Sequence, residues 1–199
     1  MKLSAIILAS GSSTRFGVED KLTVPLHGKP LIRHVIDTVQ SLGLCQTLLV
    51  TAPASSLASL IGDTVVTMVT NDRHREGMGT SIAAGVTALA PCDGVFILPG
   101  DMPFIDSAVF EELRYRFDRM PAPDILAPAF EGRRGHPVLF SARCFGELAG
   151  LEGDRGAAAM LASGHYYVEL LAVSTPAILL DIDTPEDLVR ANRYAVPQE

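Results

Sequence analysis

The sequence lacks long hydrophobic runs. Hydrophobic residues make up 48% of its 199 residues, yet no apolar stretch reaches the roughly 18–20 residues that a membrane-spanning helix needs. The N-terminus carries one lysine and then an apolar run that meets Gly11, where a signal peptide would have a cleavage site. We therefore expect a cytoplasmic protein with no membrane partner.

Cysteine and positive charge are also scarce. Cys45, Cys92 and Cys144 are too few and too widely spaced for a disulfide framework or a zinc site, so we expect reduced thiols in or near the core. The formal net charge of −7 argues against a nucleic-acid partner. It leaves room for a small anionic ligand, because local basic residues decide whether one binds.

Strand-like and helix-like segments alternate along the chain, and the strand-like segments are continuous apolar runs. This pattern is typical of an α/β fold in which helices cover both faces of a mostly parallel sheet. No repeat, low-complexity tract or linker appears, so we expect one domain over residues 1–199. The expected strands are 4–9, 47–52, 64–69, 94–103 (running into a turn), 124–130, 136–140, 166–171 and 177–182, and the expected helices are 30–42, 54–61, 80–90, 107–120, 142–150, 155–163 and one from Thr184.

Polar, glycine-rich segments follow three of the expected strands, at 10–21, 70–79 and 99–103. Open α/β sheets bind ligands at the carboxyl ends of their strands. We therefore expect these three segments to form a crevice at one edge of the sheet.

The first of these segments belongs to LASGSSTRFGVEDK, residues 8–21. Gly11 and Gly17 allow a close approach of backbone to ligand, and backbone N–H groups in such a turn can cradle phosphate. Arg15 supplies a forked donor and Lys21 a compact positive charge. The loop has neither the P-loop nor the dinucleotide-binding glycine pattern. It predicts an anion site, although an ordinary flexible loop with solvated charges would have a similar composition.

The third segment is LPGDMP, residues 98–103, which places Asp101 at the end of a buried strand. A carboxylate held there is a natural ligand for Mg²⁺, which takes few carboxylates and completes its shell with phosphates and water. An aspartate that only caps a turn would also fit this position.

The motifs LASGSSTRFG, EGMGTS, LPGDMP, GHPVLF, GDRGA and DIDTPEDL occur in this order over residues 8–188. Together they resemble the MobA-like NTP transferases, and most closely the molybdenum cofactor cytidylyltransferase branch. The first and third motifs are shared by many nucleotidyltransferases. GHPVLF and GDRGA are narrower and carry the assignment to that branch.

The resemblance implies a three-layer α/β/α, Rossmann-like nucleotidyltransferase fold, with its antiparallel part within 124–182. It implies Mg²⁺-dependent transfer of CMP from CTP to a phosphorylated pterin cofactor of the molybdopterin type, with release of pyrophosphate. Residues 1–120 would form the nucleotide-binding half and 121–199 the acceptor-binding half. A molybdenum hydroxylase is the implied client of the product.

The resemblance also implies roles for individual residues. Arg15, Lys21 and Asp101 would be catalytic, with Asp101 and Asp183 as metal ligands. His136 and Asp154 would lie on the acceptor side. The nucleotide would contact Leu8, Ala9, Ser10, Gly11, Arg15, Lys21, Gly79, Ser81 and Gly100.

Some of these residues could instead have purely structural roles. Thr80 or Ser81 would serve equally well as a helix cap, and Asp154 as the cap of the helix that follows it. Asp181 and Asp183 lie two residues apart and would share one face of a strand. DIDTPEDL also reads as a helix start, with Thr184 as cap and Pro185 in the first turn.

One position departs from the family pattern. Relatives usually read LAAG where this chain has LASG, so Ser10 adds a hydroxyl, and guanylyl-transferring relatives tend toward LAGG. CTP is therefore the expected nucleotide, and GTP is the second candidate. A same-fold enzyme with a different phosphorylated acceptor and a non-catalytic carrier of molybdenum cofactor are two rival hypotheses.

Overall fold

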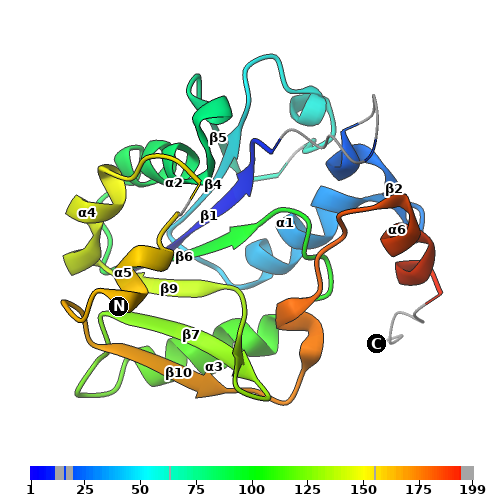
Figure 1. Cartoon of the computed structure of the whole chain (residues 1–199). Coiled ribbons are helices and arrows are strands. Elements are labelled where there is room, and N and C mark those ends of the chain that lie inside the picture. Colours follow the sequence, from blue (N-terminus) through cyan, green and yellow to red (C-terminus); the bar gives the residue numbers. More distant parts are fainter. Residues whose placement is uncertain (12–15, 17–19, 63, 155, 194–199) are drawn as a thin grey trace.

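The computed structural model describes residues 1–11, 16, 20–62, 64–154 and 156–193. A twisted sheet runs through the centre of the molecule, and helices lie on both of its faces (Figure 1). The strands are β1 (Leu3–Ala9), β2 (Pro25–Leu26), β3 (Lys29–Pro30), β4 (Gln46–Thr51), β5 (Thr67–Thr70), β6 (Gly94–Pro99), β7 (Ile125–Phe130), β8 (Arg133–Arg134), β9 (Val138–Ser141) and β10 (Val168–Ala172). The α-helices are α1 (Leu31–Ser41), α2 (Met78–Thr87), α3 (Ser107–Phe117), α4 (Phe145–Ala149), α5 (Ala158–Ala162) and α6 (Pro185–Ala191).

The main sheet is mostly parallel, as the apolar runs predict. Its order in the described residues is β10-β7-β9-β6-β1-β4-β5, with β8 beside β7. β1 lies between β4 and β6 and is parallel to both. β9 is antiparallel to β6 and to β7, which confirms the expected antiparallel part within 124–182. This order places the carboxyl ends of β1 and β6 next to each other.

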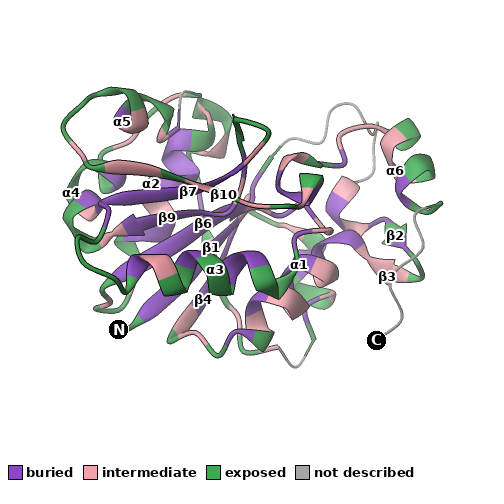
Figure 2. Cartoon of the chain, turned by 90° about the horizontal axis from the view of Figure 1, so that it is seen from below, coloured by how far each residue is buried: buried purple, intermediate pink, exposed green. Residues whose placement is uncertain are grey.

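Two hydrophobic cores explain why the strands are apolar on both faces. Successive side chains of a strand point to opposite faces. Ile7 accordingly packs in the core that contains α1 and α3, and its neighbour Ile6 packs in the core that contains α2 and α4. Figure 2 shows the buried strands between helices whose outer surfaces are exposed. The predicted three-layer α/β arrangement is confirmed.

The predicted strand over 177–182 is wrong. The structure has a 3₁₀ helix, η6 (Pro176–Leu179), which is capped by the side chain of Thr175 and has proline in its first turn. The Ile178 carbonyl accepts the N–H of His136, and the N–H of Ile182 donates to the carbonyl of Asp101. His136 and Asp101 lie just outside β9 and β6, so these two hydrogen bonds are not part of a strand ladder. In the described part of the chain, the segment 177–182 pairs with no strand. Its apolar character comes from burial of Ile178 and Ile182.

The helix caps show which polar residues have a structural role at helix starts. α6 begins with a capping box between Thr184 and Asp187, as its sequence predicts. α2 has Gly77 at its N-cap, so neither Thr80 nor Ser81 caps it. α5 has Ala157 at its N-cap, so Asp154 does not cap that helix.

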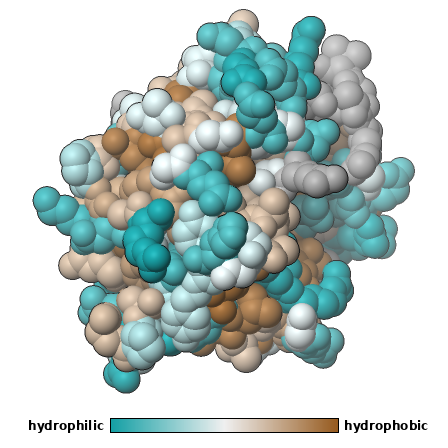
Figure 3. Space-filling view, turned by 60° about the vertical axis from the view of Figure 1, so that its left-hand side comes forward, coloured by the Kyte–Doolittle hydropathy of each residue, from teal (hydrophilic) through white to brown (hydrophobic). Residues whose placement is uncertain are grey.

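On the face in Figure 3, hydrophobic side chains form small patches separated by hydrophilic ones.

The three cysteines differ in burial. Cys144 is buried as expected, Cys92 is half-buried, and Cys45 is exposed, which corrects the expectation for that thiol. Within the described ranges, no helix is long and apolar enough to cross a membrane.

Candidate active site

A cavity of about 590 Å³ opens at the carboxyl ends of β1 and β6. The predicted crevice therefore exists, and all three polar segments contribute to it. Two residues from the C-terminal part of the chain, Asp154 and Asp183, complete the wall. The lining residues are Leu8, Ala9, Ser10, Gly11, Lys21, Leu22, His74, Arg75, Gly77, Met78, Ser81, Pro99, Asp101, Asp154 and Asp183.

Lys21 and two carboxylates form the charged part of this wall. The Lys21 Nζ lies 2.6 Å from Asp101 Oδ2 and 2.6 Å from Asp183 Oδ1. Burial would lower the pKa of Lys21, but the two carboxylates outweigh burial, so the pKa is raised above its ordinary value. The ammonium group is therefore positively charged at neutral pH.

Asp101 is held at the cavity by the close approach of β6 to β1. It follows Gly100, whose N–H donates to the carbonyl of Leu8 at 2.9 Å. A Cβ on Gly100 would lie 2.8 Å from the Ile32 side chain and 3.2 Å from the Leu8 carbonyl oxygen. Gly100 does not line the cavity, and a side chain there would meet Ile32 of α1 and the end of β1.

Asp183 reaches the cavity through the segment that was expected to be a strand. Ile182 is bonded to the Asp101 carbonyl at 3.0 Å, and His136 to the Ile178 carbonyl at 3.0 Å. The capping box of α6 then fixes the chain just after Asp183. These contacts bring the two predicted metal ligands to one ammonium group, although they are far apart in sequence. The reason predicted for Asp183, a shared strand face with Asp181, does not apply.

The carboxylates fit a divalent metal. Asp101 Oδ1 is buried and has no hydrogen-bond partner among the described residues, which is unusual for a buried carboxylate oxygen. Among the residues that the structure describes, no three metal-ligating side chains converge. Two carboxylates completed by phosphate oxygens and water are the set that Mg²⁺ prefers. Asp101 and Asp183 would therefore hold the ion.

A buried chain of polar side chains connects Ser10 with α2. Ser10 Oγ and Ser81 Oγ lie 2.6 Å apart, and the Asn71 side-chain amide donates to Ser81 Oγ at 2.9 Å. The N–H of Arg73 donates to Asn71 Oδ1, which fixes the orientation of the amide. Ser81 Oγ therefore accepts from Asn71. The two serines have two hydroxyl protons and share one mutual bond, so one hydroxyl proton is not used in that bond.

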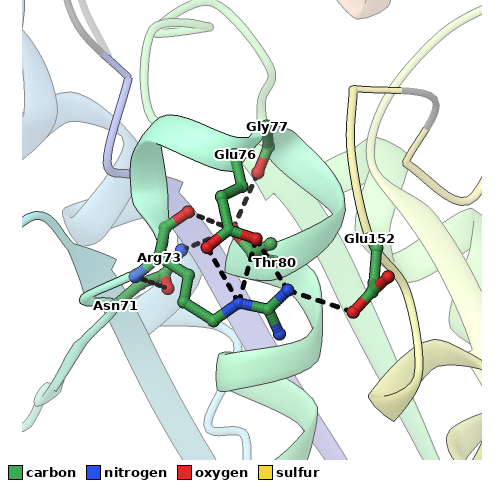
Figure 4. Close-up of polar contacts among 6 residues, drawn as sticks. All are labelled: Asn71, Arg73, Glu76, Gly77, Thr80 and Glu152. Atoms are coloured by element: carbon green, nitrogen blue, oxygen red, sulfur yellow. Dashed lines mark hydrogen bonds and ion pairs between the residues drawn. The ribbon is translucent and has the colours of Figure 1, made fainter.

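The segment 152–154 packs against the start of α2 (Figure 4). The N–H of Gly79 donates to the Gly153 carbonyl at 2.8 Å. Arg73 lies between Glu76 and Glu152 and bonds to both. This contact places Asp154 at the cavity wall.

Gly77 and Gly79 are the residues that permit this contact. A Cβ on Gly77 would lie 2.3 Å from the Gly153 carbonyl carbon, and one on Gly79 would lie 2.8 Å from the Glu152 carbonyl oxygen. Gly79, predicted as a nucleotide contact, does not line the cavity. Its position requires glycine because the backbone of 152–153 lies against it.

His136 does not line the cavity. Its backbone N–H donates to the Ile178 carbonyl, and its Nδ1 is buried without a hydrogen-bond partner in the described ranges. Burial lowers the pKa of His136, so the imidazole is neutral at neutral pH. Arg15, the other predicted phosphate ligand, lies outside the described residues.

The predicted segment 70–79 forms one wall of the cavity, but sequence reasoning did not single out its lining residues His74, Arg75 and Met78. These residues directly precede or begin α2. Arg75 is exposed at the cavity and has no ion-pair partner among the described residues, whereas Arg73 is paired with two glutamates. Their position in or directly before EGMGTS, residues 76–81, was the available signal.

The fold and the site define an α/β protein whose cavity combines a cation, paired carboxylates and a hydroxyl pair at the carboxyl ends of the strands. The sequence matches the MobA-like NTP transferase domain over residues 5–169. The chain belongs to this family of nucleotidyltransferases.

Relatives named for different activities are similarly distant from this chain. The purine catabolism protein PucB of Bacillus subtilis is 30% identical and covers 94% of this chain and 96% of its own length. A molybdenum cofactor guanylyltransferase of Vibrio cholerae is 31% identical and covers 94% and 90%. The molybdenum cofactor cytidylyltransferase of Escherichia coli is 31% identical but covers 65% and 64%.

Solved structures agree with the fold. Rv0371c of Mycobacterium tuberculosis superposes with a TM-score of 0.85 at 26% identity, covering 98% of this chain and 99% of its own. A manganese complex of the same protein has a TM-score of 0.78 at 27% identity, covering 98% and 100%. A divalent metal is therefore found with a protein of this fold.

Proposed function

We propose that this protein transfers CMP from CTP to a phosphorylated pterin cofactor of the molybdopterin type and releases pyrophosphate. The observation that carries the proposal is the convergence of Lys21, Asp101 and Asp183 on one cavity. Residues 1–120 form the nucleotide half. Residues 121–199 form the acceptor half and also contribute Asp183 to the cavity of the nucleotide half.

The residues of the site favour phosphoryl chemistry that needs no protein base. A phosphate nucleophile is already ionised near neutral pH, so the task is charge neutralisation and in-line placement. Lys21 binds the triphosphate and stabilises the negative charge of the leaving pyrophosphate. A divalent ion bound by Asp101 and Asp183 would polarise the phosphate oxygens. The acceptor's phosphate oxygen forms a bond to the α-phosphorus as the bond to the pyrophosphate oxygen breaks.

The nucleotide base is the finer part of the proposal. Ser10 and Ser81 line the cavity and present one hydroxyl proton, which suits an acceptor atom such as O2 or N3 of cytosine. GTP is the second candidate, since the guanylyltransferase relative covers more of this chain than the cytidylyltransferase relative does. Comparing CTP, GTP, ATP and UTP in thermal unfolding with Mg²⁺ tests this part.

The unfolding experiment has a clear scale. A ligand that binds only the native state stabilises it by about 2.7 kcal/mol at a hundredfold excess over Kd. Mg²⁺-dependent stabilisation by CTP above the other three nucleotides would support the proposal. Selectivity for GTP would keep the chemistry and change the base. A folded sample that responds to no triphosphate would favour a carrier of molybdenum cofactor.

Replacing Lys21 with alanine is expected to raise the barrier to transfer by about 2–3 kcal/mol, the effect of deleting one preorganised electrostatic donor. The measurement is kcat/KM for pyrophosphate release. Lys29→Ala is the control, because Lys29 pairs with Asp37 at 2.8 Å and does not line the cavity. An unchanged kcat/KM in Lys21→Ala would remove Lys21 from the mechanism.

The acceptor half gives a second prediction. Replacing His136 with alanine is expected to raise KM for the pterin acceptor more than KM for the nucleotide, because His136 lies in the proposed acceptor half, just before β9, and does not line the nucleotide cavity. His165→Ala, at an exposed histidine before β10, is the control. The opposite pattern of KM values would place His136 on the nucleotide side.

A further inference from the structure

The Lys21 ammonium lies between the two carboxylates that would hold the metal. Its Nζ is 2.6 Å from an oxygen of each, and the side chains of Lys21 and Asp101 are only 13% and 17% exposed. The charge of each carboxylate is therefore already compensated by a cation that belongs to the chain. A charged pair this close and this sheltered from water is costly to separate without a replacement partner.

A divalent ion and an ammonium group have opposite requirements at these oxygens. The metal needs the lone pairs of Asp101 and Asp183 as ligands, whereas the ammonium uses them as hydrogen-bond acceptors. Both cations placed against the same two oxygens would also repel each other at short range. The second oxygen of Asp101, buried and without a hydrogen-bond partner in the described part of the chain, is an acceptor that Lys21 does not use.

We propose that Lys21 is the resident cation of this site before substrate binds, and that the divalent metal takes its place only when a nucleotide arrives. This inference rests on the proposed function for the identity of the metal ligands. The triphosphate supplies new anionic oxygens for the displaced ammonium and further ligands for the metal. Metal and nucleotide therefore bind cooperatively, and each strengthens the binding of the other by the same factor.

The test is Mn²⁺ binding to the purified full chain without nucleotide, measured by calorimetry and by loss of the free-ion electron paramagnetic resonance signal. Lys21→Met removes the charge and keeps much of the length. It is expected to bind Mn²⁺ at least about tenfold more tightly than the wild type, within the usual range of coupling between sites. Lys21→Arg keeps a cation and is expected to remain weak.

Two further variants keep the test specific. Lys29→Met, which removes a cation paired elsewhere with Asp37, is expected to leave Mn²⁺ affinity unchanged. Lys21→Met combined with Asp101→Asn is expected to lose the gained affinity, which places the new metal at Asp101. Thermal unfolding gives a second readout, because Mn²⁺ should stabilise Lys21→Met more than the wild type.

Equal Mn²⁺ affinity of the wild type and Lys21→Met would overturn the proposal, and so would a gain that persists in the double variant. Neither outcome depends on the base or the acceptor, because no nucleotide or pterin is present. If the double variant loses the gain but no nucleotidyl transfer is found, the competition between Lys21 and the metal stands and the proposed reaction fails.

Discussion

Replacing Asp101 with asparagine is expected to lower kcat/KM for nucleotidyl transfer by about 10²–10³, the loss that follows removal of one preorganised charge-stabilising group. Asp101 contacts Lys21 at 2.6 Å and would contribute one of the two carboxylates for the metal. Asparagine keeps the size of the side chain but loses its charge. Both the position of Lys21 and the affinity for the metal should suffer.

The measurement is the initial rate of pyrophosphate release at several nucleotide and Mg²⁺ concentrations. Asp106→Asn is the matched control, because Asp106 caps α3 and does not line the cavity. The unfolding midpoint of each variant shows whether the fold is intact. Near-normal activity of a folded Asp101→Asn protein would remove this residue as a metal ligand.

Replacing Gly77 with alanine is expected to reduce the free energy of unfolding by about 3 kcal/mol. Gly77 has φ +120°, where a Cβ is disfavoured, and its Cβ would lie 2.3 Å from the carbonyl carbon of Gly153. Backbone at φ +120° and ψ 173° is essentially confined to glycine and costs another residue roughly 1–3 kcal/mol, and overpacking adds about 1–3 kcal/mol. Relief requires the 152–154 segment to move away from α2, which displaces Asp154 from the cavity.

Gly153→Ala separates the two causes. Gly153 also has a positive φ, +66°, but nothing lies within 4 Å of its Cβ position. Its replacement is expected to cost only the conformational part, about 1–2 kcal/mol. Chemical denaturation of both variants measures the difference. Equal losses would show that the close contact between α2 and 152–153 does not contribute to stability.

Most of the sheet could be predicted from the sequence, because a strand buried on both faces leaves a simple signal. β1 is apolar except for Ser4, since its neighbouring residues Ile6 and Ile7 pack in different cores. Helix ends were predictable where a side chain acts locally, as Thr184 does in α6. These features depend on neighbours in the chain, and a single sequence records them directly.

The segment 177–182 shows where this reasoning fails. Its apolar residues are buried like those of a strand, but its backbone bonds to His136 and Asp101, which are distant in sequence. An apolar run records burial and says nothing of which partner receives the backbone hydrogen bonds. The metal-ligand role predicted for Asp183 gains support from the cavity, although the strand-based argument for its orientation was wrong.

The glycines of the site show a second limit. Gly79 and Gly100 were expected to meet the nucleotide, yet each is a glycine because another part of the backbone or core lies against it. A glycine signals close approach, but the sequence does not say what approaches. The contact between Gly77 and Gly153, and with it the position of Asp154 beside the nucleotide half, became visible only in three dimensions.

Transfer of a cytidylyl group to a phosphorylated pterin is the step on which the proposed function depends. The decisive experiment incubates the purified protein with Mg²⁺, molybdopterin-type cofactor and CTP labelled at the α-phosphate, with GTP labelled in the same way in parallel. We expect label from CTP to appear in the pterin product, one pyrophosphate to be released for each product formed, and Asp101→Asn to slow both by about 10²–10³. A folded, metal-supplied wild-type protein that moves no label from either nucleotide to the pterin would show that the proposed reaction is wrong.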